Sequence, residues 1–116
     1  MKITDEGNRI KAISIDNDCY PELLRVIENP PEVLYYIGDL GICGTLCLAV
    51  VGARKATPYG KWAAYNIAKL TAEHGVTIIS GMASGIDTCG HLGALAAGGS
   101  TIAVLGCGPD ICYPRT

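Results

Sequence analysis

Short apolar runs alternate with helix-length segments through the second part of this 116-residue sequence. The runs are LCLAVVG (46–52), VTIIS (76–80) and STIAVLG (100–106). Each is largely apolar rather than alternating with polar residues, as in strands that are buried on both faces. Strands of this kind, separated by helices, predict a parallel sheet with right-handed crossover connections. We therefore expect an α/β fold with helices on both faces of the sheet.

The segments between these runs carry helix-boundary signals. Thr57 is a suitable N-cap, Pro58 is a suitable first helical residue, and Gly75 is placed to end the same helix. A second helix is expected over about 87–97. Together these elements predict the first half of a Rossmann-like sheet, which is either truncated after the third strand or covered at its exposed edge by a partner. Helical spacing indicates the residues of the first helix that pack on the sheet: Ala63, Ile67 and Leu70.

Residues 1–45 are expected to form a separate helical and turn segment that docks on the sheet. The pattern predicts a short helix around 21–27, a break at Pro30-Pro31, and a second short helix or turn that ends at Gly38. The apolar residues of this segment are too few for it to fold alone. The chain is thus divided into 1–45 and an incomplete sheet domain, 46–116.

Charge and cysteine content indicate the compartment. The net charge is −2, yet residues 1–39 contain eight carboxylates and four cations, whereas residues 40–116 contain three and five. No secretory signal or membrane-length apolar stretch is found, so we predict a cytoplasmic protein without membrane contact. The six cysteines are interpreted as reduced thiols, and no cofactor is predicted. The alternative is a zinc site from a histidine with Cys43, Cys47, Cys107 and Cys112, although their spacings are unusual for zinc.

Three loops are expected to meet beyond the carboxyl ends of the strands, where open parallel sheets bind ligands. They are 52–59, 81–87 and 106–113, and each begins with glycine. The first two lead into helix N-termini, which favour anions, and the cations of the stretch 52–72 are accompanied by no carboxylate. This pattern predicts a site for a phosphate-containing ligand. Its candidate residues are Gly52, Arg54, Lys55, Thr57, Tyr59, Gly60, Gly81, Ser84, Gly85 and Gly106.

The common nucleotide-binding patterns are absent from these loops, because neither the P-loop nor the G-x-G-x-x-G spacing occurs. The glycines could alternatively do no more than close tight turns. Asp87 and His91 lie four residues apart and could form a catalytic pair, but we interpret them as structural support for the loop. Among the aromatic residues near the basic loop, Tyr59 is the better candidate for stacking on bases, whereas helix packing is favoured for Trp62 and Tyr65.

Four segments resemble the bacterial DNA-processing protein A family, also called DprA or Smf: CYPELLRVIENPPEVLYYIGDL, VVGARKATPYG, IISGMASGIDTCGHLGAL and GGSTIAVLGCGPDICYP. They cover almost everything from Cys19 to Pro114, in the family's order. The resemblance implies an extended Rossmann-like domain that binds single-stranded DNA and helps to load the RecA recombinase in natural transformation and homologous recombination. It implies no catalysis.

The same resemblance assigns roles to particular residues. Arg54 is expected to grip a DNA phosphate, and Ser84 stands where family members often carry Lys or Arg. The later family segments, which complete the sheet and mediate self-association, would lie beyond Thr116, so a homodimer is expected of the full-length protein. The pocket lining implied by the SGxAxGID motif is Ser80, Gly81 and Gly85.

Three functions remain open from the sequence. The first is a non-enzymatic module that binds single-stranded DNA through its phosphates with little reading of sequence. The second is an enzyme or sensor for a small nucleotide that uses the same pocket, although the P-G-G-x-G-T stretch of related nucleotide-cleaving proteins is missing. The third is a scaffold whose pocket is unused.

Overall fold

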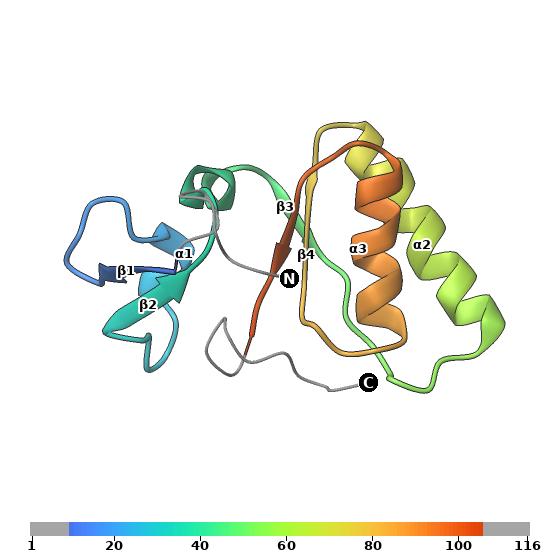
Figure 1. Ribbon diagram of the computed structural model, residues 1–116, viewed down its shortest axis with the longest axis horizontal. Helices are drawn as coiled ribbons and strands as arrows, with labels where there is room; N and C mark the ends of the chain where they lie inside the picture. The colour runs from blue at the N-terminus through green and yellow to red at the C-terminus, as the bar shows by residue number, and fades with distance from the viewer. Residues whose placement is uncertain (1–9, 106–116) are drawn as a thin grey trace.

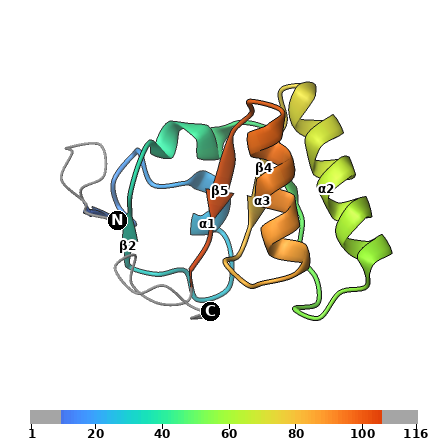
Figure 2. The same cartoon turned by 45° about the vertical axis from the view of Figure 1, so that its right-hand side comes forward.

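A computed structural model describes residues 10–105 of the chain. Figure 1 shows two parts: a small N-terminal unit (residues 10–44) and a parallel sheet with two long helices. The N-terminal unit lies on the side of the sheet opposite the long helices, a relation that is also clear in the turned view of Figure 2. The predictions for Gly106, Cys107 and Cys112 concern positions outside the described residues.

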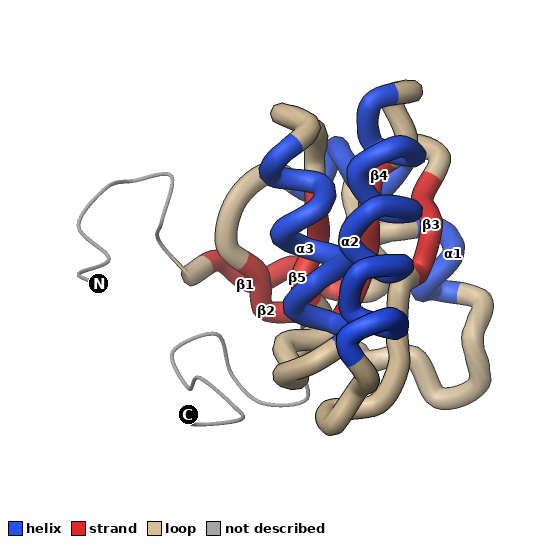
Figure 3. The backbone as a smooth tube through the Cα atoms, turned by 90° about the vertical axis from the view of Figure 1, so that its right-hand side faces the viewer, coloured by secondary structure: helices blue, strands red, loops and turns tan. Residues whose placement is uncertain are grey.

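The parallel sheet contains β3 (Cys47–Ala49), β4 (Thr77–Ser80) and β5 (Thr101–Ala103) in the order β3-β4-β5. Leu48 pairs with Ile78, and Ile79 pairs with Ile102. The predicted α/β fold with a parallel sheet is therefore confirmed. Within the described residues, however, the two long helices share one face (Figure 3), because the strand order advances in a single direction.

The long helices are α2 (Pro58–Glu73) and α3 (Ile86–Ala96). The end signals of α2 are confirmed: the Thr57 hydroxyl accepts a hydrogen bond from the Gly60 amide at 3.0 Å, and Gly75 has a φ of +82°. The predicted core face is wrong for its large residues, since Ile67 and Leu70 are 56% and 60% exposed. The buried face of α2 consists of Ala64, Ala68 and Ala72.

Close contact between α2 and α3 explains this small-residue face. A Cβ atom on Gly93 of α3 would lie 2.3 Å from the Tyr65 carbonyl oxygen and 3.0 Å from the Ala68 Cβ. Only glycine opposite alanine allows the two backbones to approach so closely. The core then lies between these helices and β4, and it contains Ala68, Ala72, Ile78 and Ala94 with Val50 and Ala97 against them.

The N-terminal unit is built on an antiparallel pair that the sequence analysis did not predict. The strands are β1 (Lys11–Ser14) and β2 (Val33–Tyr36), with α1 (Glu22–Arg25) between them and the 3₁₀ helix η2 (Leu40–Gly44) after them. The short helix around 21–27 is confirmed as α1. The helix or turn expected before Gly38 is instead β2, because its sequence VLYY is β-branched and aromatic and pairs with β1.

Inside this unit the side chain of Tyr20 is 2% exposed, and its hydroxyl donates to the Pro31 carbonyl oxygen at 2.8 Å. Arg25 lies over the Tyr20 ring, with its guanidinium carbon 5.6 Å from the ring centroid. The guanidinium donates to the carbonyl oxygens of Ile15 and Asn17, which fixes the loop between β1 and α1.

Among residues 10–105, no helix is both long and apolar enough to cross a membrane.

Candidate functional site

Two loops meet at the carboxyl ends of β3 and β4, and we call them the first corner (residues 52–57) and the second corner (residues 81–85). A Cβ atom on Gly85 would lie 2.4 Å from the carbonyl oxygens of both Ala53 and Arg54. Gly85 has φ +81° and ψ −125°, a backbone conformation that residues other than glycine rarely adopt. The Ile86 amide donates to the Ala53 carbonyl oxygen at 3.2 Å. The backbone of Arg54 is thus in contact with the second corner.

Asp87, in the first turn of α3, contacts both corners with its side chain. Its side chain is buried, and its Oδ1 accepts a hydrogen bond from the Gly52 amide at 3.2 Å. Its Oδ2 would lie 2.7 Å from a Cβ atom placed on Gly81. The carboxylate therefore contacts the start of both corners.

His91, one turn further along α3, contacts the second corner through its ring. Its Nε2 lies 2.7 Å from the Gly81 carbonyl oxygen, and its Nδ1 lies 2.6 Å from Thr101 Oγ1. Both ring nitrogens thus face partners other than the Asp87 carboxylate. This geometry favours support of the loop over the catalytic Asp–His pair that was the alternative.

Several predicted phosphate ligands have partners within the protein. The Gly52 amide is bound to Asp87, and the Gly60 amide is bound to the Thr57 hydroxyl, as described above. The Ser80 hydroxyl donates to the Val50 carbonyl oxygen and is buried. Because a phosphate needs donors, these groups are suited to fixing the corners in place rather than to contacting an anion directly.

Other predicted residues lie at the surface. Arg54, Lys55 and Tyr59 are exposed, while Gly81, Ser84 and Gly85 of the second corner are half-buried. The N-terminus of α3 has no side-chain cap, since Gly85 occupies the N-cap position. Backbone N–H groups at such a helix start, together with the helix dipole, favour an anion.

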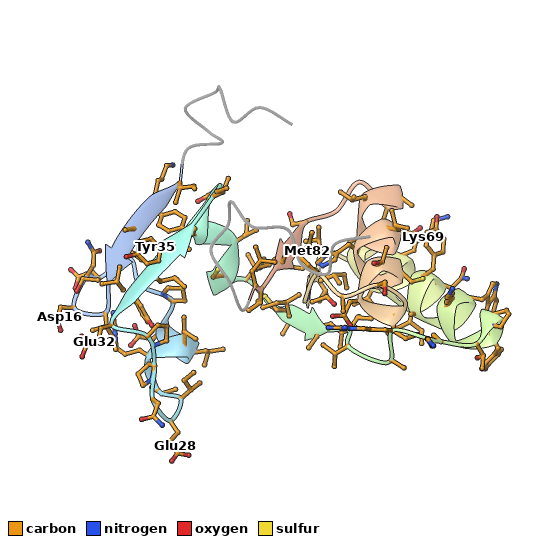
Figure 4. All side chains as sticks on the ribbon, turned by 60° about the horizontal axis from the view of Figure 1, so that its bottom comes forward. Asp16, Glu28, Glu32, Tyr35, Lys69 and Met82 are labelled. Carbon is orange, nitrogen blue, oxygen red and sulfur yellow. The ribbon has the colours of Figure 1, made fainter. Side chains whose placement is uncertain are left out.

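Charge is distributed as the sequence indicated. The first turn of α2 contains no acidic residue, and Lys61 is exposed beside it. Figure 4 shows the acidic side chains Asp16, Glu28 and Glu32 on the N-terminal unit, at the end of the molecule away from α2. The surface around the two corners therefore offers cations without a nearby surface carboxylate from that unit.

The described cysteines, which are Cys19, Cys43, Cys47 and Cys89, are free thiols. Within the described part of the chain, no group of three or more potential metal ligands is found. Burial raises the pKa of the Cys43 thiol, and Cys47 and Asp39 raise it further. A raised pKa lowers the thiolate fraction, and the thiolate is the form that binds metals.

Sequence reasoning missed Thr101, which holds the His91 ring and also donates to the Ile78 carbonyl oxygen at 3.0 Å. Thr101 faces α3 because it pairs with Ile78, whose side chain is in the core. The residues STIAV alone do not fix that register. A threonine at the start of a predicted strand was the one available signal.

The chain matches a known protein family over most of its length. The family model described as DNA recombination-mediator protein A matches residues 11–116. The chain is 39% identical over 115 residues to DNA processing protein DprA of Streptococcus pneumoniae, covering 97% of this chain and 40% of that protein. It is 39% identical over 103 residues to protein Smf of Escherichia coli K12, covering 89% of this chain and 28% of that protein.

Two solved structures are similar as well. The X-ray structure of DprA from Streptococcus pneumoniae has a TM-score of 0.84, and the match covers 95% of this chain and 38% of that one. The DprA structure from Helicobacter pylori, described for its single-stranded DNA binding mode, has a TM-score of 0.80 at 31% identity, covering 93% of this chain and 47% of that one. The present chain thus spans less than half the length of these relatives.

Proposed function

This chain belongs to the DNA recombination-mediator protein A family, and we propose that it binds single-stranded DNA at the two corners beyond β3 and β4. The observation that carries the proposal is the contact between the corners, in which Gly85 lies against the backbone of Ala53 and Arg54. This contact places the exposed cationic loop next to the N-terminus of α3, which has no side-chain cap. The Helicobacter pylori relative, which is similar in fold, binds single-stranded DNA.

The proposed contacts are mainly to phosphates. Arg54 and Lys55 supply full charges. The backbone amides of the second corner and of the first turn of α3 supply neutral donors, except the Ile86 amide, which is bound to the Ala53 carbonyl oxygen. Gly52, Gly60, Thr57 and Ser80 act as the framework, because their donors or acceptors are already used within the protein. Ser84 contributes a hydroxyl in place of a charge. Binding of this kind depends strongly on salt and only slightly on base sequence.

The wider role follows from the family. We propose that the complete protein is a cytoplasmic, non-enzymatic mediator that delivers single-stranded DNA to a RecA recombinase, and that it acts as a homodimer. The family description as a recombination mediator supports the first part. The division into an N-terminal segment, 1–45, and a DNA-binding sheet domain, 46–116, is proposed with it.

The variant Arg54→Ala tests the proposal by titration of fluorescent oligonucleotides followed by anisotropy. We expect weaker binding to all base sequences by a similar factor. The slope of log affinity against log salt should become shallower by about 0.7, the value for the loss of one phosphate contact on a single strand. Arg54→Lys should retain part of the affinity, since the charge remains while the bidentate geometry is lost.

Lys11→Ala is the matched control, because it removes an exposed cation from β1 in the N-terminal unit. It should leave both affinity and salt slope unchanged. Equal losses for Arg54→Ala and Lys11→Ala would contradict a localised site. Tight binding of a mononucleotide that oligonucleotides cannot displace would favour the small-nucleotide alternative instead.

A further inference from the structure

Two aromatic side chains project from the start of α2 into solvent. Trp62 is 62% exposed and Tyr59 is 74% exposed. Their ring centroids are 6.0 Å apart and their planes differ by 28°, so the rings are stacked on each other. A large exposed aromatic pair is uncommon on a surface, since such rings usually contribute to cores or interfaces.

The interpretation of Trp62 as a helix-packing residue is therefore wrong. The packing face of α2 includes Gly60, which is near Ile86, and the buried alanines Ala64 and Ala68. Trp62 lies two residues from Gly60 and from Ala64, which at 100° per residue places it on the outer side of the helix. Its exposure thus results from the geometry of α2 and does not depend on a particular rotamer.

The chemistry around the pair is cationic. Lys61 lies between the two aromatic residues in the chain, and Arg54 and Lys55 precede them in the first corner; all three are exposed. Cations near a helix N-terminus are unfavourable to the helix dipole, so this arrangement is not one that helix stability would select. Aromatic rings among cations are the combination with which proteins hold single-stranded nucleic acids, through stacked bases and neutralised phosphates.

We propose that Tyr59 and Trp62 form a stacking platform for a base of the single strand whose phosphates are bound at the two corners. The inference rests on the proposed function and extends its site from the corners onto the outer face of α2. Paired bases are stacked inside a duplex, so the platform also favours single strands over duplexes. Charge complementarity favours this occupant over a protein partner, since a protein-binding face is depleted of lysine.

Trp62 is the only tryptophan of the chain, which makes its fluorescence a direct report of the platform. The test compares oligo(dT) with an abasic phosphodiester of the same length, which retains the phosphates and lacks the bases. We expect oligo(dT) to quench the fluorescence and the abasic strand to leave it almost unchanged. Trp62→Ala should weaken oligo(dT) binding about tenfold, near the lower end of the range for one base–aromatic contact, and leave abasic binding within twofold.

Leu70→Ala is the control, because Leu70 is 60% exposed on the same helix about 12 Å further along its axis. It should alter neither ligand's affinity. Arg54→Ala should weaken both ligands, which separates failure of the phosphate site from failure of the platform. Equal weakening of both ligands by Trp62→Ala would overturn the platform, as would unquenched fluorescence at saturating oligo(dT). Fluorescence that changes with protein concentration alone would overturn it in favour of contact between copies.

Discussion

Replacement of Gly85 by alanine should separate the two corners. The new Cβ would lie 2.4 Å from the carbonyl oxygens of Ala53 and Arg54, and these are backbone atoms that cannot rotate away. The residue would also retain φ +81° and ψ −125°, which is unfavourable for any side chain. The first corner must therefore move, and the hydrogen bond from Ile86 to Ala53 is stretched or lost with it.

The expected magnitude follows from three contributions. Backbone strain costs about 1–3 kcal/mol, overpacking costs about 1–3 kcal/mol, and the lost hydrogen bond costs about 0.5–1.5 kcal/mol. We expect the free energy of unfolding to fall by about 3 kcal/mol or more. With an m-value of about 2 kcal/mol/M, that loss lowers the urea midpoint by about 1.5 M. The folded fraction should also bind single-stranded DNA more weakly, since its corners no longer meet.

Gly98→Ala is the matched control. Gly98 also has a positive φ, +69°, but no atom lies within 4 Å of the position that its Cβ would occupy. Both substitutions reduce the entropy of the unfolded chain equally, so that effect cancels between them. We expect Gly98→Ala to cost only about 1 kcal/mol. If equilibrium urea unfolding gives the two variants the same stability, the close contact between the corners is not what the structure implies.

Two further predictions concern Asp87 and Cys43. Asp87→Ala leaves the Gly52 amide without its acceptor and should lower the free energy of unfolding by about 1–3 kcal/mol in urea titrations. Asp87→Asn, which retains an oxygen, should cost less. Equal stabilities of the two variants would refute the bracing role of the carboxylate. The raised pKa of Cys43 should make that thiol react with iodoacetamide more slowly than the exposed Cys19 at mildly alkaline pH. The labelling rates can be followed by peptide mass spectrometry. Faster labelling of Cys43 would contradict the raised pKa. Because the folded state holds the Cys43 proton more tightly, its contribution to stability is present below the ordinary thiol pKa and is lost as pH rises through the raised one.

Local signals predicted the elements well where one residue decides the backbone. Thr57, Pro58 and Gly75 set the ends of α2 because capping, a fixed φ and a left-handed conformation are properties of those residues alone. The apolar runs likewise located β3, β4 and β5, since each strand lies within its predicted run. The meeting of the first two loops followed from the parallel arrangement of those strands.

Features that depend on a distant partner were not predictable. The α2 sequence contains two apolar stripes, one with Ile67 and one with Ala64 and Ala68, and the choice depends on Gly93 of α3. The pairing of β1 with β2 joins segments on either side of α1. Each strand is too short for its residue pattern alone to identify it as a strand. The internal use of the Ser80 hydroxyl similarly depends on where the Val50 carbonyl oxygen lies.

The glycine–alanine contact between α2 and α3 also has a mechanical consequence. No long side chain separates the two backbones there, so neither helix can shift by rotamer changes without losing contact with the other. The two helices should therefore move as one rigid body. The rings of Tyr59 and Trp62 on α2 then keep a constant distance from the backbone amides at the start of α3. A ligand that spans both would find its contacts already spaced and would lose little entropy in ordering them.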